Sequence, residues 1–188
     1  MIADNAKLLA RAYKPGWYGS DITGRQFYRT TYRPDSVQLL TSPAPQYNGQ
    51  AGKVLRDGVK SNGDFKNGKW VGFREVPLTA LLRFEKPVEA RKISLSMLQN
   101  VGSSIFPPVR VEVWGGMEPG KLKLLGTEKP PVPGEKDPRN EDKLYEYSFQ
   151  ATPIKYIKVV AVPLAKLPAW HSGKGQPAWV FMDEVLVN

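Results

Sequence analysis

Two neighbouring groups of residues near the C-terminus have the chemistry to bind a ligand and an ion. Trp170 and His171 stand in a polar, glycine-rich stretch, and Asp183 and Glu184 follow in an apolar one. An aromatic ring beside a hydrogen-bonding ring suits the apolar face and the hydroxyls of a sugar. A carboxylate in an apolar strand needs a partner, because burying an unpaired charge is costly. The pattern favours a binding module with a structural cation over an enzyme.

An oxygen-rich segment over residues 54–65 offers further ligands for an ion. It contains Asp57, Asn62 and Asp64, which resemble the hard oxygen ligands that Ca²⁺ takes in groups of about six to eight. The helices and spacing of an EF-hand are missing. A polar hairpin loop with Asx turns is an equally open interpretation. Asp183, for its part, can pair with a Lys or Arg instead of an ion.

Other polar and aromatic residues allow two interpretations each. Gln99 and Asn100 follow an apolar segment, and their amides can bond sugar hydroxyls or the loop backbone, the commoner case. Trp70 is expected to be a core aromatic rather than a ligand platform. The Trp170-His171 pair is likewise open to a purely structural role.

Alternation of apolar and polar residues predicts strands over most of the chain. No crossover helix interrupts them, so the strands should be antiparallel and form an all-β sandwich preceded by an N-terminal extension. A short helix is predicted at the start, from Asp4 as N-cap to Tyr13, ended by Lys14-Pro15-Gly16. We expect an extension or interdomain linker over 1–35 and the sandwich domain over 36–188. The strands are predicted near 36–41, 78–84, 92–97, 109–114, 145–149, 156–162 and 179–187.

Composition limits the function classes. The 188 residues suit one domain with an extension, and the single His and missing Cys argue against zinc. The net charge of +9 is concentrated in residues 1–60, which hold nine Lys and Arg against four Asp and Glu. No dense basic cluster is present, so we expect no nucleic-acid partner. No apolar run reaches the length of a membrane span, so no membrane insertion is expected, and no signal peptide is visible.

The order of short motifs resembles a galactose-binding-like domain, also called discoidin or F5/8 type C. More narrowly, it is similar to the C-terminal module of family-20 β-N-acetylhexosaminidases of Bacteroidetes. The resemblance covers about residues 36–188. The motifs are Leu55 to Gly58, Trp70 to Phe73, Leu98-Gln99, Ile105 to Pro108, Val111 to Val113, Tyr156 to Ala161 and Ala178 to Val185.

The resemblance implies a jelly-roll sandwich with a structural Ca²⁺ near the loop tips. Asp57 and Glu184 would hold the ion, with Asn62 or Asp64 as additional ligands. Family-32 carbohydrate-binding modules share this fold and bind sugars on loop tips with an aromatic ring and polar partners. The corresponding candidates in this sequence are Trp170, His171, Gln99, Asn100, Phe106 and Lys174.

The resemblance further implies a non-catalytic carbohydrate-binding module of a secreted bacterial glycoside hydrolase, located in the periplasm or outside the cell. Its ligand would be a glycan ending in galactose or N-acetylhexosamine. The alternative is a structural domain that packs on a glycosidase catalytic domain through residues 1–45. An enzyme is not expected, because glycosidases need two carboxylates facing each other across a pocket. Asp183 and Glu184 are adjacent on a strand and should point to opposite faces.

Overall fold

The computed structural model describes residues 6–137 and 140–188. Its main body is an antiparallel β-sandwich built from one sheet, in the order β4-β9-β5-β8-β6-β7, with β3 also paired to β5. The predicted all-β antiparallel sandwich is therefore confirmed. Its strands are β3 (Ser36–Leu39), β4 (Val71–Arg74), β5 (Leu78–Asn100), β6 (Arg110–Gly116), β7 (Lys123–Glu128), β8 (Asn140–Val162) and β9 (Trp179–Val187). Three short 3-10 helices, η1 (Pro45–Tyr47), η2 (Lys53–Arg56) and η3 (Val101–Ser103), lie in the connections.

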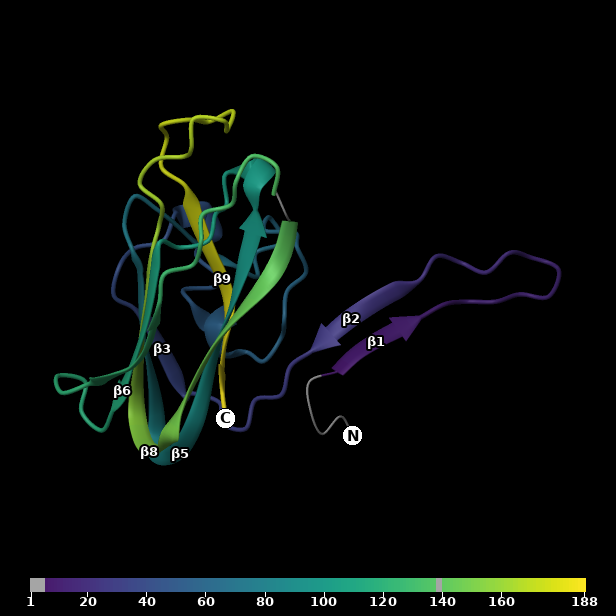
Figure 1. Cartoon of the computed structure of the whole chain (residues 1–188). Coiled ribbons are helices and arrows are strands. Elements are labelled where there is room, and N and C mark those ends of the chain that lie inside the picture. Colours follow the sequence, from purple (N-terminus) through teal and green to yellow (C-terminus); the bar gives the residue numbers. More distant parts are fainter. Residues whose placement is uncertain (1–5, 138–139) are drawn as a thin grey trace.

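The two longest strands, β5 and β8, fold the sheet into two layers. They pair along most of their length, but the register slips between Arg83 and Val88 and again between Ala90 and Lys92. Figure 1 shows both ribbons bending at the lower end of the molecule, and we call this end the corner. The first half of β5 pairs with β3 and the second half with β9. The sequence predicts two separate strands here because the exposed corner residues break the alternation.

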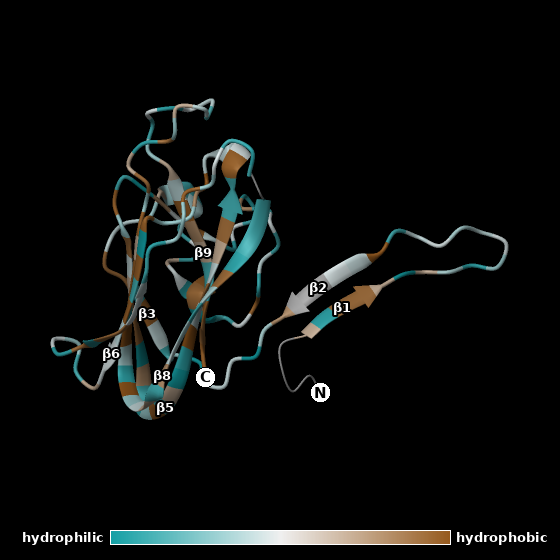
Figure 2. Ribbon diagram, viewed as in Figure 1, coloured by the Kyte–Doolittle hydropathy of each residue, from teal (hydrophilic) through white to brown (hydrophobic). Residues whose placement is uncertain are grey.

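Inward-facing apolar residues of both layers form one core. The first half of β5 supplies Leu78, Ala80 and Leu82, and the second half supplies Ile93 and Leu95. In Figure 2 hydrophobic and hydrophilic colours alternate along the strands near the corner, as expected where one side of each strand faces the core. Trp70 is fully buried in a second cluster with Leu98, Ile105 and Phe181, which confirms its predicted core role.

The N-terminal segment is a β-hairpin, so the predicted helix is wrong in its described part. Strand β1 (Ala6–Ala10) pairs antiparallel with β2 (Thr23–Phe27). An isolated helix of this length is marginal in water. Pairing with β2 instead gives the backbone of residues 6–10 hydrogen-bond partners in a second strand. Asp4, the expected cap, lies outside the described residues. The hairpin with its loop, residues 6–27, projects away from the sandwich, and we call it the arm (Figure 1).

The segment after the arm is fixed to the sandwich. The N–H groups of Thr31 and Tyr32 donate to the carbonyl of Val187 at 2.9 and 3.0 Å. The Thr31 N–H also reaches the Asn188 side chain at 3.0 Å. Strand β3 then begins at Ser36, where the sandwich domain is predicted to start. None of the described residues forms a helix that is long and apolar enough to cross a membrane.

Candidate functional site

The predicted sugar-binding rings meet at the end of the sandwich away from the corner. We call this end the tip, and it is formed by residues 101–109 after β5 and 163–178 between β8 and β9 (Figure 1). The ring of Phe106 lies 6.1 Å from Trp170 and 5.4 Å from His171, and Trp170 lies 5.8 Å from His171. The structure thus brings Phe106 to the Trp170-His171 pair, from which more than 60 residues separate it in the sequence.

His171 holds the tip loop in place through both ring nitrogens. The Gly173 N–H donates to Nδ1 at 2.9 Å. The proton of the neutral ring is therefore assigned to Nε2, which donates to the carbonyl of Val101 at 2.7 Å. His171 is buried, as is Phe106 beside it. These contacts give His171 a positioning role under the Trp170 ring.

The other residues that the sequence predicts to bind sugar differ in their exposure to solvent. Gln99 is buried, and the half-buried Asn100 accepts a hydrogen bond from the Ser103 N–H at 3.1 Å, capping η3. Trp170 is half-buried and Lys174 is exposed. A ligand on this surface would therefore meet Trp170 and Lys174 first, with the other candidates behind them. The sugar site itself stays a prediction.

A β-bulge in β9 places the two adjacent carboxylates on one side of the sheet. Ser96 pairs with Glu184 and Met97 with Met182, so Asp183 is the extra residue. Core residues reflect the shift, since Val180 and Met182 face inward before the bulge, and Val185 and Val187 after it. The expectation that Asp183 and Glu184 point to opposite faces is wrong, because it assumes an unbroken strand.

Glu184 is a buried carboxylate that lacks a full set of partners. It is only 3% exposed, and its Oε2 has no hydrogen-bond partner in the described structure. Burial, and then the negative charge of Asp57, raise the pKa of Glu184 to about 8, although the Gly58 N–H opposes the shift. A cavity of about 240 Å³ reaches Glu184 from solvent. A cation at this point would relieve the repulsion between the two carboxylates.

Only part of the predicted calcium set comes together. Asp57 is half-buried near Glu184, and its Oδ1 accepts the Val59 N–H at 2.7 Å. Asn62 and Asp64 instead accept backbone N–H groups of their own loop at 3.3 and 3.0 Å, which are Asx turns. Among the described residues no group of three or more acidic, His or Cys side chains is placed to hold a metal. The Asp57–Glu184 pair fits Ca²⁺ only if backbone carbonyls or waters supply the other oxygens.

Asp183 is compensated from within the chain, as one interpretation of the sequence expects. Its Oδ2 lies 3.0 Å from Lys60 Nζ and accepts the Ser61 N–H at 2.7 Å. Lys60 also pairs with Asp142 at 3.1 Å, and its ammonium lies 5.0 Å from the centre of the Trp70 ring. Burial still raises the pKa of Asp183, while Lys60 acts to lower it. Lys60 thus fixes residues 57–69 to β9, and we call this segment the loop over β9.

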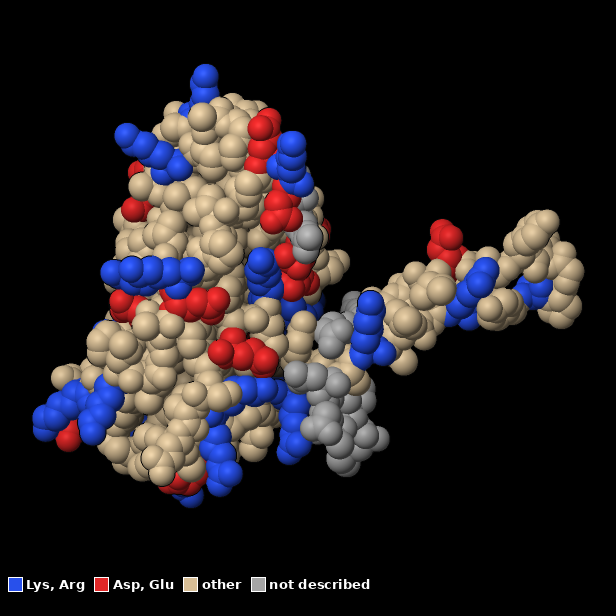
Figure 3. Space-filling model, viewed as in Figure 1, with Lys and Arg blue, Asp and Glu red and all other residues tan. Residues whose placement is uncertain are grey.

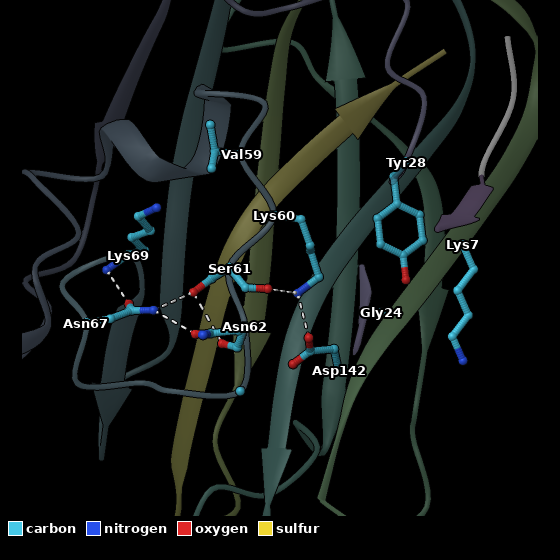
Figure 4. A pocket seen from close by; sticks show the side chains of 11 residues that line it. Lys7, Gly24, Tyr28, Val59, Lys60, Ser61, Asn62, Asn67, Lys69 and Asp142 are labelled. Carbon is cyan, nitrogen blue, oxygen red and sulfur yellow. Dashed lines mark hydrogen bonds and ion pairs between the residues drawn. The ribbon is translucent and has the colours of Figure 1, made fainter. Parts of the chain in front are cut away.

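A polar pocket beside Lys60 is the feature that the sequence did not predict. We call it the Lys60 pocket; it measures about 480 Å³ and lies between the arm and residues 59–69 (Figure 4). The amides, hydroxyls and lysines of residues 59–69 are visible in the sequence. The second wall of the pocket includes Lys7, which the sequence predicts in a helix, and Gly24 and Tyr28, which it predicts in an extension or interdomain linker. Its lining consists of Lys7, Gly24, Tyr28, Val59, Lys60, Ser61, Asn62, Gly63, Asn67, Lys69 and Asp142.

Comparison with known proteins identifies the fold. No family profile and no curated protein matches the chain by sequence. Among solved structures, a family-32 module of Clostridium perfringens in complex with GalNAc-β-1,3-galactose is 14% identical, with a TM-score of 0.53 over 81% of this chain and 93% of that one. The family-32 module of C. perfringens NanJ, in complex with galactose, is 13% identical, with a TM-score of 0.51 over 81% and 91%.

A third similar structure is the C-terminal domain of a chitobiase from Bacteroides fragilis. It is 17% identical, with a TM-score of 0.50 over 84% of this chain and 95% of that domain. At these identities the likeness is one of fold. The chain has the sandwich fold that these three structures share, as the motif order predicts.

Proposed function

We propose that this chain is a non-catalytic carbohydrate-binding module that serves a secreted bacterial glycoside hydrolase, of the β-N-acetylhexosaminidase type. It acts in the periplasm or outside the cell and binds glycans that end in galactose or N-acetylhexosamine. The observation that carries the proposal is the half-buried Trp170 ring at the tip of a sandwich whose structural neighbours are carbohydrate-binding modules.

The packing under Trp170 supports a preformed stacking surface. Phe106 and His171 contact the ring from the protein side, and the two hydrogen bonds of His171 fix the loop. A ring held in this way loses little conformational freedom when a sugar stacks on it. The exposed Lys174 is available to sugar hydroxyls. The tip lies away from the arm (Figure 1), so an enzyme domain that contacts the arm leaves the tip accessible.

A structural Ca²⁺ is part of the proposal. Asp57 and Glu184 would hold it, and the unpartnered Oε2 of Glu184 supports this assignment. The ion would supply positive charge to a buried pair of carboxylates and fix the loop to β9. Asn62 and Asp64 would contribute only after breaking their Asx turns.

Glycan binding by the purified chain, with and without Ca²⁺, tests this function. We expect selective binding to galactose- or N-acetylhexosamine-terminated glycans, lost in Trp170→Ala. Trp17→Ala is the matched control, since Trp17 is 71% exposed on the arm, far from the tip. Absence of binding to a broad glycan array by well-folded protein would contradict the proposal, as would equal losses in both variants.

One observation favours the alternative of a structural domain that packs on a catalytic domain. The arm is a two-stranded ribbon, which is marginal in water by itself, and it exposes many large apolar side chains. Lysine and arginine recur along it in Figure 3 with little acidic charge between them, which suits an acidic partner surface. If this alternative holds, deleting residues 1–27 stops association with the parent catalytic domain and leaves the sandwich folded. The exposed side chains are Leu8, Leu9, Tyr13, Trp17, Tyr18, Ile22 and Phe27.

A further inference from the structure

We propose that the Lys60 pocket is a second binding site, distinct from the tip, and that it takes an acidic oligosaccharide whose sugars carry carboxylates. Its volume of about 480 Å³ falls within the range of about 300–1,000 Å³ that small-molecule sites occupy. The site depends on the arm for one wall and on the loop over β9 for the other. It does not include Trp170.

The loop wall of the pocket is held in a fixed shape by its own side chains. Asn67 Nδ2 donates to Ser61 Oγ at 3.0 Å and to Asn62 Oδ1 at 2.9 Å. Asn67 Oδ1 accepts the Lys69 N–H at 2.9 Å. Figure 4 shows this network along one side of the pocket. Fixed donors and acceptors favour binding, because less conformational freedom is lost when the ligand arrives.

The opposite wall carries Tyr28, whose position is set by the anchored segment that follows it. Thr30 Oγ1 accepts the Val187 N–H at 3.1 Å, and Thr31 and Tyr32 bond to the same end of β9. Burial raises the pKa of the Tyr28 hydroxyl, so the group stays a neutral donor and acceptor. In Figure 4 its ring stands across from the loop wall, with Lys60 between the two.

The charge of the lining favours an anion. Lys7 and Lys69 are exposed and make no ion pair within the described residues. Lys60 is shared between Asp142 and the buried Asp183. With both carboxylates counted, the lysines still leave the pocket net positive. In Figure 4 Lys7 and Lys69 lie on opposite sides of Lys60, which fits a ligand with more than one negative group rather than a single small anion.

The neutral groups favour a sugar as the carrier of that charge. A hydroxyl from Ser61, a phenol from Tyr28 and amides from Asn62 and Asn67 line the pocket, and each both donates and accepts hydrogen bonds. Such a lining matches a ligand rich in hydroxyls. Among the described residues that line the pocket, none stands at the N-terminus of a helix, where backbone N–H groups commonly bind phosphate.

The experiment is a titration of ¹⁵N-labelled chain with digalacturonic acid, its neutral counterpart galactobiose and a sulfated galactobiose, followed by amide chemical shifts. We expect digalacturonic acid to shift resonances of residues 59–69 and, judged from these resonances, to bind there at least about fivefold more tightly than galactobiose, which the tip is proposed to bind. Lys7→Gln and Lys69→Gln should each weaken it about threefold. Lys86→Gln, which changes an exposed lysine at the corner, is the matched control and should leave it unchanged. Raising the ionic strength should weaken binding further.

Several results would overturn the proposal. These are equal affinity for galactobiose at residues 59–69, shifts confined to the tip loop, and lysine variants that bind like the control. Preference for the sulfated disaccharide would overturn the carboxylate assignment. Both variants change exposed side chains, so unchanged thermal unfolding excludes misfolding as the cause. Trp170→Ala should retain binding of digalacturonic acid, which keeps failure at the tip distinguishable from failure here.

Discussion

Asp183 and Glu184 are neighbours on β9, and both are buried under the same loop. The charged groups around the two carboxylates nevertheless have opposite signs. Lys60 and the Ser61 N–H meet Asp183, whereas the charged group with the largest effect on the pKa of Glu184 is another carboxylate, Asp57. We call the first site complete because it contains its own cation, although Oδ1 of Asp183 also has no hydrogen-bond partner in the described structure. We call the second site incomplete because no cation is among the groups that shift the pKa of Glu184. The comparison shows that one loop neutralises one buried carboxylate and brings a second negative charge toward its neighbour.

The largest expected effect comes from removing the cation of the complete site. Lys60→Met should destabilise the fold by about 3–5 kcal/mol, because it leaves the buried Asp183 charge uncompensated. Urea unfolding measures the change. Lys69→Met, on the same loop but exposed, is the control and should stay within about 0.5 kcal/mol. A Lys60 variant as stable as this control would show that Asp183 does not depend on Lys60.

The incomplete site should make stability depend on pH when metal is removed by a chelator. The pKa of Glu184 is raised from its ordinary 4.5 to about 8, so between these values the folded chain holds a proton that the unfolded chain has lost. Stability is therefore full below about pH 4.5 and falls as pH rises toward 8, by at most about 1.4 kcal/mol per pH unit. Asp57 and Asp183 are the acidic groups that face it.

Unfolding by denaturant at several pH values, compared between variants, isolates this effect. Glu184→Gln should remove the slope, because the amide does not titrate. Glu89→Gln, at an exposed position on the corner, should keep the slope of the unaltered chain. If Glu184→Gln shows the same pH dependence as Glu89→Gln, burial and the charge of Asp57 do not raise the pKa of Glu184 in solution.

Calcium should stabilise the second site and leave the first unchanged. At a concentration about 100 times the dissociation constant, the ion adds about 2.7 kcal/mol to the free energy of unfolding. Thermal unfolding with Ca²⁺ or with chelator measures this gain at pH 7. Glu184→Gln should abolish it, and Mg²⁺ should give less, because the pair lacks a rigid octahedral set of ligands. An equal gain in Glu184→Gln would place the ion elsewhere.

Whether the sequence predicts the different surroundings of Asp183 and Glu184 depends on how far apart in the chain the contacting residues lie. Alternation identifies the strands of the core, and an apolar strand with carboxylates correctly indicates that Asp183 and Glu184 need partners. The bulge escapes detection, because residues 179–187 are apolar on both sides and show no period that one extra residue would break. Lys60 is not predictable as the partner, since 123 residues separate it from Asp183.

The arm and the tip also contain features that depend on contacts between residues distant in the sequence. The apolar residues of 6–10 allow a helix or a strand, and only the pairing with 23–27 decides between them. At the tip, the Trp170-His171 motif is local, and the two rings lie 5.8 Å apart in one loop. The role of His171 depends on the carbonyl of Val101, 70 residues away, so the sequence cannot distinguish a positioning side chain from a ligand contact.

The smallest expected effect distinguishes the two halves of the loop over β9. Asp64→Asn should change neither the calcium-dependent gain nor the pH slope, because Asp64 is exposed and its Oδ1 accepts the Lys66 N–H rather than facing Glu184. Asp57→Asn should reduce both, since it removes the charge that raises the pKa of Glu184 and one ligand of the proposed ion. Calcium titrations monitored by thermal unfolding compare the variants. A loss of calcium response in Asp64→Asn would mean that the ion draws Asp64 out of its Asx turn, and the site would then extend along the loop toward Lys60.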